Sequence, residues 1–242
     1  MLERVSAIAR SVATDIPALS YVVATDDQKI ETFCYKNQIP VIMTPISCQS
    51  GSDRVMAAAL KTTPMPDYII NLQGDMPFLP AAHLRQFIES MMALQSQSIQ
   101  VFSLCVPLEW PQLDRLRELK KATPMSGTTV VTDQHQMALW FSKNILPALR
   151  DEAHLRKTMP LSPVLRHIGI YGYHIEALKE FCQRSPSYYE THESLEQLRF
   201  LENNIPIKMI RGKPIPGFLL SGIDSPEDVA RAEDWLSLNR CE

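Results

Sequence analysis

The sequence contains no apolar run of about 18 residues, the length that a membrane-spanning helix needs. Near its start, Glu3, Arg4 and Arg10 interrupt the apolar residues, so this stretch lacks the continuous hydrophobic region of a signal peptide. The 5 cysteines are scattered and form no CxxC pair, which argues against a disulfide framework and against a zinc site. From these absences we expect a cytoplasmic protein with no membrane partner.

Basic charge is also scarce. Lys and Arg number 24 against 27 Asp and Glu, a net charge of −3, whereas proteins that bind nucleic acid usually carry a basic excess on one face. Nucleic acid is therefore not an expected partner, although a small anionic ligand needs only a few local donors. Neither GxGxxG nor GxxxxGK[ST] occurs, so the common glycine-rich phosphate loops are absent as well.

What the sequence does contain is an alternation of short β-rich runs with helical patterns over 242 residues, which predicts one α/β domain with a mostly parallel sheet. Expected strands lie near 18–25, 39–44, 67–72, 99–106, 167–173 and 206–211. Expected helices lie near 1–13, 28–36, 50–60, 81–94, 174–183, 193–203 and 226–238. The stretch Thr25-Asp26-Asp27 is a candidate N-cap for the second helix and Ser52 for the third.

The middle of the chain breaks this alternation. "TTVVTDQHQMALWFS" predicts two strands, near 128–132 and 137–142, joined by a tight polar turn. We therefore expect a β-rich insertion from about 107 to 170 within the single domain 1–242.

Two carboxylates follow apolar strands. Asp75 comes after "DYIINL" in "NLQGDMPFLP", and Asp224 lies in "SGIDSPEDVARAEDWL" before a proline and two acids that predict a helix start. Ligands of parallel sheets sit at the carboxyl ends of the strands, and Mg²⁺ typically takes one or two carboxylates plus substrate phosphates. The alternative is that each aspartate only caps a turn or a helix.

Five motifs in order, "CQSGSDR", "QGDMP", "HIGIYGY", "LEQLR" and "GIDSPED", resemble those of the 3-deoxy-manno-octulosonate (Kdo) cytidylyltransferases, or CMP-Kdo synthetases. That family shows HQSGTER, QGDEP, HLGIYGY, LEQLR and GVDTPED. The resemblance covers nearly the whole chain. It implies a Rossmann-like nucleotidyltransferase fold with a smaller, partly β dimerisation element, in agreement with the predicted insertion.

The resemblance also implies roles for individual residues. Asp75 and Asp224 would be the catalytic Mg²⁺ ligands. The nucleotide, CTP, would lie against the residues Ser50, Gly51, Ser52, Arg54 and Gln73. The sugar acid would be held by Gln73, Lys143, His167, Tyr171, Glu196 and Gln197, with Lys143 where the family usually has arginine.

Some of these residues also have structural interpretations. His167 and Tyr171 alternate along a strand and can be half-buried polar residues, Glu196 can form a helical ion pair with Arg199, and Arg54 can be a solvated helix residue.

The sequence departs from the family pattern at several points. The family begins with a strand and a loop of the type PARxxSxRLPxKPL, which holds the triphosphate, whereas this chain begins at MLERV, corresponding to the helix after that loop. Loss of that strand would remove a central rung of the sheet. Cys48 replaces a histidine, Met76 a glutamate, and Thr129 a lysine. Three explanations stay open: a truncated or mis-started form of an active enzyme, which we favour, a paralogue that binds sugar or nucleotide without turnover, or an enzyme for another ulosonic acid such as 8-amino-Kdo.

The implied reaction is CTP plus Kdo giving CMP-Kdo and pyrophosphate, a step of lipopolysaccharide biosynthesis. A homodimer is also implied, paired through the inserted segment, whose apolar residues are Val130, Val131, Leu139, Trp140 and Phe141.

Overall fold

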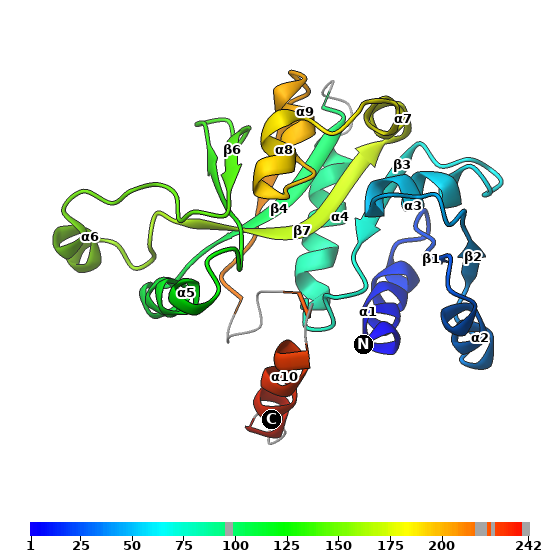
Figure 1. Cartoon of the computed structure of the whole chain (residues 1–242), viewed down its shortest axis with the longest axis horizontal. Helices are drawn as coiled ribbons and strands as arrows, with labels where there is room; N and C mark the ends of the chain where they lie inside the picture. The colour runs from blue at the N-terminus through cyan, green and yellow to red at the C-terminus, as the bar shows by residue number, and fades with distance from the viewer. Residues whose placement is uncertain (95–98, 216–221, 224–225, 239–242) are drawn as a thin grey trace.

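A computed structural model describes residues 1–94, 99–215, 222–223 and 226–238 of the chain (Figure 1). The strands are β1 (Val23–Thr25), β2 (Val41–Met43), β3 (Tyr68–Leu72), β4 (Val101–Pro107), β5 (Thr129–Thr132), β6 (Ala138–Ser142), β7 (Leu165–His174) and β8 (Ile207–Arg211). The helices are α1 (Leu2–Asp15), α2 (Gln28–Lys36), α3 (Gly51–Ala59), α4 (Ala81–Leu94), α5 (Trp110–Ala122), α6 (Glu152–Thr158), α7 (Ile175–Gln183), α8 (Tyr188–Glu193), α9 (Leu198–Glu202) and α10 (Pro226–Leu238). Within these ranges no helix is both long and apolar enough to cross a bilayer.

The six-stranded sheet has the order β6-β5-β7-β4-β8, and β3 pairs with residues 170–174 of β7, on the edge of β7 that β5 uses at residues 165–166. Both β3 and β4 run antiparallel to β7, while β8 runs parallel to β4 and β5 antiparallel to β7. Thus β3, β4, β5 and β8 share one direction, which confirms the α/β fold and the predominant strand direction. What the sequence did not indicate is that β7 lies antiparallel among them, so that most neighbouring pairs in this sheet are antiparallel.

The position of β7 follows from the path of the inserted segment. β4 ends at Pro107 directly opposite Leu165, the first residue of β7. The chain therefore leaves the sheet at the end of β4 and returns to it at that same end. A strand that starts there beside β4 must run antiparallel to β4. The predicted hairpin is present as β5 and β6, but the segment also contains α5 and α6, so it is less β-rich than we expected.

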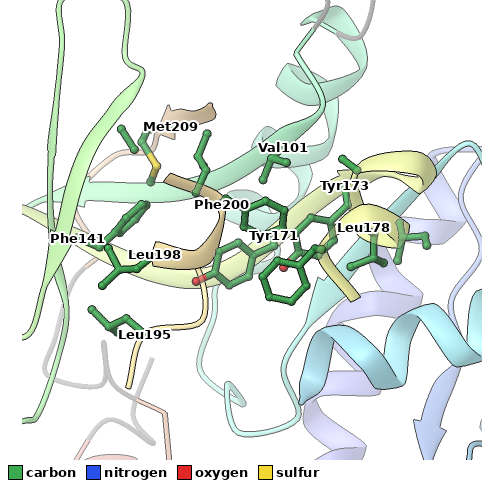
Figure 2. Packing of buried hydrophobic residues seen from close by; sticks show 14 of the residues in the cluster. Val101, Phe141, Tyr171, Tyr173, Leu178, Leu195, Leu198, Phe200 and Met209 are labelled. Atoms are coloured by element: carbon green, nitrogen blue, oxygen red, sulfur yellow. The ribbon is translucent and has the colours of Figure 1, made fainter. Parts of the chain in front are cut away.

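Alternate residues of the central strands face two different cores, as the pleat of a buried strand requires. Phe102 and Leu104 of β4 pack with α1 and α4, whereas Val101 and Cys105 pack with α3, α7 and α9. In the second core the rings of Tyr171, Tyr173 and Phe200 follow one another (Figure 2), with centroids 5.7 Å apart at each step. A third, smaller cluster joins α5 to the start of β7.

A separate pair of strands, β1 and β2, lies at the end of the domain far from α6 (Figure 1). β1 and β2 pair in parallel around α2, and among the described residues neither pairs with β3 or with another strand of the six-stranded sheet. Asp27 caps α2 by accepting a hydrogen bond from the backbone N–H of Lys29 at 2.6 Å, within the stretch 25–27 that was expected to supply the cap.

Helix boundaries were predicted less well than strands. The expected helix 193–203 does not form as one element: α8 ends at Glu193, Ser194 takes a left-handed conformation with φ of 51°, and α9 begins at Leu198. α5, α6 and α8 were not predicted. α10 begins at Pro226, as the sequence indicated, whereas its expected cap lies outside the described residues.

Candidate active site

The end of β3 carries the central carboxylate of the predicted site. Asp75 lies three residues after the strand, and its backbone oxygen accepts a hydrogen bond from the N–H of Ile223 at 2.9 Å. Gly222 packs so closely that a Cβ added to it would overlap the Asp75 carboxylate and lie 2.9 Å from its Cγ. Gly222 and Ile223 thus lie against Asp75, whereas Asp224, the second predicted Mg²⁺ ligand, lies outside the described residues.

Gln73 lies between Asp75 and the sheet. A Cβ placed on Gly169 of β7 would lie 3.3 Å from Oε1 of Gln73, so the amide covers this glycine. Here β7 bulges, because the register with β4 shifts between Ser103 and Leu104 and skips two β7 residues. Bulges beside functional sites commonly redirect side chains. The bulge, together with the lack of a side chain on Gly169, makes room for the Gln73 amide over β7.

The predicted nucleotide turn forms the start of α3. Ser50, and not Ser52, is the N-cap: its hydroxyl accepts from the N–H of Asp53 at 3.1 Å, and the Asp53 carboxylate accepts from the N–H of Ser50 at 3.1 Å. This reciprocal pair leaves the side chain of Ser52 to point into the protein. Gly51 sits on the exposed side of the turn, where a Cβ would still lie 3.6 Å from Nδ2 of Asn71.

Arg54 extends away from the turn toward the two-stranded sheet. Its Nη2 lies 2.9 Å from the Asp26 carboxylate and its Nη1 donates to the Thr44 hydroxyl at 2.8 Å. Asp26 follows β1 and Thr44 follows β2, so one guanidinium joins α3 to the ends of both strands. Arg54 is therefore not a solvated helix residue, and its fork is engaged by a carboxylate of the chain itself.

A buried polar cluster lies between α3, β7 and the segment before α9. The Ser52 hydroxyl donates to Oε2 of Glu196 at 3.0 Å and lies 3.3 Å from the hydroxyl of Tyr173. Burial, reinforced by the negative charge of Glu196, raises the pKa of Tyr173 well above its usual value, so its phenol stays protonated. The other carboxylate oxygen of Glu196 has no hydrogen-bond partner.

His167 and Tyr171 face the same side of β7 as this cluster. The hydroxyl of Ser103 donates to the backbone oxygen of Ile170 at 2.8 Å, so it must accept from Nε2 of His167, also at 2.8 Å. Nε2 therefore carries the proton and Nδ1 is an acceptor. Burial first, then the charges of Lys143 and Arg166, lower the pKa of His167 to about 3, so the imidazole is neutral at ordinary pH.

Tyr171 completes this wall. Burial, with contributions from Tyr173 and Glu196, raises the pKa of Tyr171 well above its usual value. Its ring centroid lies 5.4 Å from that of His167. Both side chains are buried rather than half-buried, so their interpretation as ordinary half-buried strand residues does not describe them.

Two further predicted sugar-binding residues, Gln197 and Lys143, lie just before α9 and just after β6. Gln197 is buried, and its Nε2 has no hydrogen-bond partner. Lys143 follows β6, and its backbone N–H donates to Oε2 of Glu193 at 2.6 Å, which fixes the loop to the end of α8. Thr129, at the family's lysine position, is fully buried and donates to the backbone oxygen of Asn144 at 2.7 Å, so it holds this same loop.

The expected ion pair of Glu196 with Arg199 is replaced by a different one. The Arg199 guanidinium grips Glu190 with bonds of 2.7 Å from Nε and 2.5 Å from Nη2, and it stacks on Phe181 at 4.1 Å. Because Glu190 lies on α8 and Arg199 on α9, this buried pair joins the two helices on either side of Glu196 and Gln197.

A groove of about 590 Å³ opens beside the cluster. Its lining includes Ser50, Asp53 and Glu196 and the connection from α7 to α8. Its size is in the range of small-molecule sites. The groove therefore gives the start of α3 and Glu196 an approach from solvent.

The donor groups near Asp75 decide which metal this site could hold. Among the described residues no group of three His, Cys, Asp or Glu side chains gathers in one place. Asp75 offers a hard oxygen donor, and Gly222 and Ile223 pack against it. Such a donor set fits a cation that takes one or two carboxylates and completes its shell with water and phosphate, as Mg²⁺ does.

Three residues at this site were not singled out from the sequence. Asn71, Ser103 and Tyr173 are all buried and polar, and all lie on the side of the sheet that carries His167 and Tyr171. The signal was present in the strand patterns, since a polar residue inside an otherwise apolar buried strand must be paired or must serve a ligand.

The chain is similar in sequence and in structure to proteins of known activity. A family model described as "Cytidylyltransferase" matches residues 4–210. The 3-deoxy-manno-octulosonate cytidylyltransferase of Maricaulis maris is 35% identical over 98% of this chain and 87% of its own length. The enzyme of the same name from Psychromonas ingrahamii is 33% identical over 98% and 89%. A solved structure of CMP:2-keto-3-deoxy-manno-octonic acid synthetase complexed with CTP superposes with a TM-score of 0.77 at 26% identity, covering 98% of this chain and 87% of that one.

Proposed function

The chain belongs to the cytidylyltransferase family, and from this premise we propose that it transfers the cytidylyl group of CTP to Kdo, giving CMP-Kdo and pyrophosphate. The observation that carries the proposal is the match, over 98% of the chain, to relatives named for this reaction and to a synthetase solved with CTP. Such a product would serve lipopolysaccharide biosynthesis.

In the reaction, the anomeric hydroxyl oxygen of the sugar attacks the α-phosphorus of CTP. A new P–O bond forms, the bond from the α-phosphorus to the bridging oxygen breaks, and pyrophosphate leaves with that electron pair while the hydroxyl proton is lost. The chain's task is chiefly to position the two substrates and to neutralise charge. His167 does not suit the role of proton acceptor, because its pKa of about 3 makes it a very weak base. Its role in the proposal is to orient the sugar through Nδ1.

Asp75, together with Asp224, would hold Mg²⁺, which would neutralise charge on the phosphates and lower the pKa of the attacking hydroxyl. The support in the described residues is the Asp75 carboxylate after β3 and the segment Gly222–Ile223, which packs against it. Asp75 also orders that segment through its own backbone oxygen.

We assign the nucleotide to the start of α3 and the sugar acid to the wall of β7. Ser50 and Gly51 present backbone to the base and ribose, while Arg54 holds this turn in place through Asp26 and Thr44. Gln73 lies between the two substrates. His167, Tyr171, Glu196 and Gln197 offer hydroxyl-binding groups, and Lys143 offers a charge for the sugar carboxylate.

Pyrophosphate release from CTP and Kdo in the presence of Mg²⁺ tests the proposal. We expect release that requires both substrates and the metal, with ATP and sialic acid as controls for each substrate. The assay is to be run on this chain and on a version extended by any in-frame upstream coding sequence. Binding of CTP and Kdo by both without release would favour a binding protein, and release with another ulosonic acid but not with Kdo would reassign the substrate.

We also propose a homodimer formed through the β5–β6 hairpin. Two of the five apolar residues predicted to pair, Val130 and Phe141, are fully buried in the chain itself and are not available to a partner. Leu139 is exposed, and Trp140 packs edge-on against Tyr189 with centroids 5.0 Å apart. This exposed apolar surface supports pairing. Light scattering on the wild type and Leu139→Glu tests it, because a 27.4 kDa species for the wild type at micromolar concentration would contradict it.

A further inference from the structure

Asn71 is a buried amide with an unused donor. Only 5% of the residue is exposed, and its side chain lies at the hydroxyl of Tyr173, which can take up only one of the two N–H donors of Nδ2; no other hydrogen-bond partner satisfies this nitrogen. A buried donor without a partner lowers stability, and native proteins rarely retain one unless it has a task. Asn71 is on β3, two residues before Gln73, and its Cα pairs with that of Tyr171 across the sheet. The unused donor therefore lies inside the candidate site.

The surroundings of Asn71 join the two halves of the site. Its Nδ2 lies 3.6 Å from where a Cβ on Gly51 would be, at the turn assigned to the nucleotide. On the other side are Tyr171 and, through the hydroxyls of Tyr173 and Ser52, the Glu196 carboxylate. Asn71 thus lies where the proposed nucleotide and sugar regions meet.

Two other buried atoms nearby also lack partners: the acceptor Oε1 of Glu196 and the donor Nε2 of Gln197. A hydroxyl can accept one hydrogen bond and donate another, so hydroxyls of a single ligand can satisfy both amide donors and the carboxylate together. A phosphate cannot, since it would bring negative charge against Glu196 in a buried setting. The chemistry of these three atoms fits a polyhydroxy ligand.

We propose that Asn71 is a substrate-binding residue that donates a hydrogen bond from Nδ2 to a hydroxyl of the sugar acid, and that Glu196 accepts from the same face of the sugar. The inference rests on the proposed function for the identity of the sugar. It adds to that function a residue that selects for a hydroxyl at one ring position, because a site built to bond a hydroxyl discriminates strongly against an analogue without it.

The first test compares stability with binding in Asn71→Leu, which keeps much of the volume and removes the amide. If the amide serves a ligand, Tm without ligand stays equal or rises, while Kd for Kdo, measured by calorimetry, weakens about tenfold. Asn71→Ser provides a second, smaller variant if the leucine does not fold. The matched control is Ser6→Ala, which removes another buried unpaired polar atom, on α1, and should leave Kdo binding unchanged. A lower Tm with unchanged Kdo affinity would overturn the proposal and make Asn71 structural.

The second test uses Kdo analogues that each lack one hydroxyl. The wild type should lose about tenfold in affinity for one analogue, and Asn71→Leu should bind that analogue and Kdo equally well. If the variant weakens CTP rather than Kdo, the hydroxyl belongs to the ribose and the assignment to the sugar acid is wrong. Suppose that the wild type turns over CTP and Kdo, but Asn71→Leu discriminates among the analogues as the wild type does. The proposed function then stands and only the role of Asn71 is wrong. If wild type binds neither substrate, the proposed function fails with it.

Discussion

Lowering the pH from 7.5 to 5.5 should destabilise the protein through His167. In the folded chain the pKa of this imidazole is about 3, because it is buried and lies near Lys143 and Arg166. In the unfolded chain its pKa returns to about 6.5. The unfolded state therefore binds the proton more readily, so this contribution to stability is complete above pH 6.5 and is lost progressively as the pH falls toward 3.

The magnitude follows from the two values. At pH 5.5 about nine-tenths of the unfolded chains carry a proton on this residue, and almost none of the folded chains do. The free energy of unfolding should thus fall by about 1.4 kcal/mol between pH 7.5 and 5.5 on account of His167. In this window most carboxylates stay charged, so the histidine contribution is separable from general acid unfolding.

Urea unfolding of the wild type and of His167→Gln at pH 7.5 and 5.5 measures this change in the free energy of unfolding. Gln does not titrate and can still donate an N–H toward Ser103, whose hydroxyl accepts from His167 at 2.8 Å. We expect the wild type to lose about 1.4 kcal/mol more than the variant over this interval. Equal losses in both proteins would show that His167 is not held neutral by its surroundings, and the argument about its protonation would be refuted.

Three further changes test other contacts. Asp75→Asn should remove the Mg²⁺-dependent thermal stabilisation by CTP while changing Tm without nucleotide very little; equal stabilisation of variant and wild type would disprove the metal assignment. Arg199→Met should cost about 3–5 kcal/mol in urea unfolding, because it leaves the buried Glu190 carboxylate unpaired, and a loss below about 1 kcal/mol would mean that Glu190 finds another partner. Arg54→Gln should cost about 1 kcal/mol and increase proteolysis within residues 22–50, whereas an unchanged cleavage pattern would mean that other contacts hold the small sheet.

Strands were predictable from the sequence where their apolar runs were continuous. β3, β4 and the β5–β6 hairpin lie where the patterns place them, because burial on one or both faces determines their composition. The antiparallel course of β7 was not predictable, since its direction depends on where a segment of more than fifty residues returns to the sheet, and no local pattern records that. α5 was predictable in principle, because Glu109 and Gln112 form a capping pair around Pro111.

Predictions for the site were limited in a similar way. Ser52 was taken for a helix cap because either serine of the turn has suitable chemistry, and only the packing of Ser52 against Glu196 decides between them. Arg54 has the features of a ligand-binding arginine in the sequence, yet its guanidinium is engaged by Asp26, which is 28 residues away. Asn71 was overlooked as part of an apolar strand. Its importance depends on a missing partner, which is a property of the folded chain.

The central place of β7 has a consequence for motion. β7 is hydrogen-bonded to β3 and β4 on its two sides along much of its length, so its amide hydrogens should exchange with solvent only when the whole domain opens. The backbone that carries His167, Tyr171 and Tyr173 should consequently stay in place when a ligand binds. Whatever closes over a bound substrate must come from the opposite side, where short helices, turns and loops cover the strand, and hydrogen exchange should become slower there, and not in β7, when ligand binds.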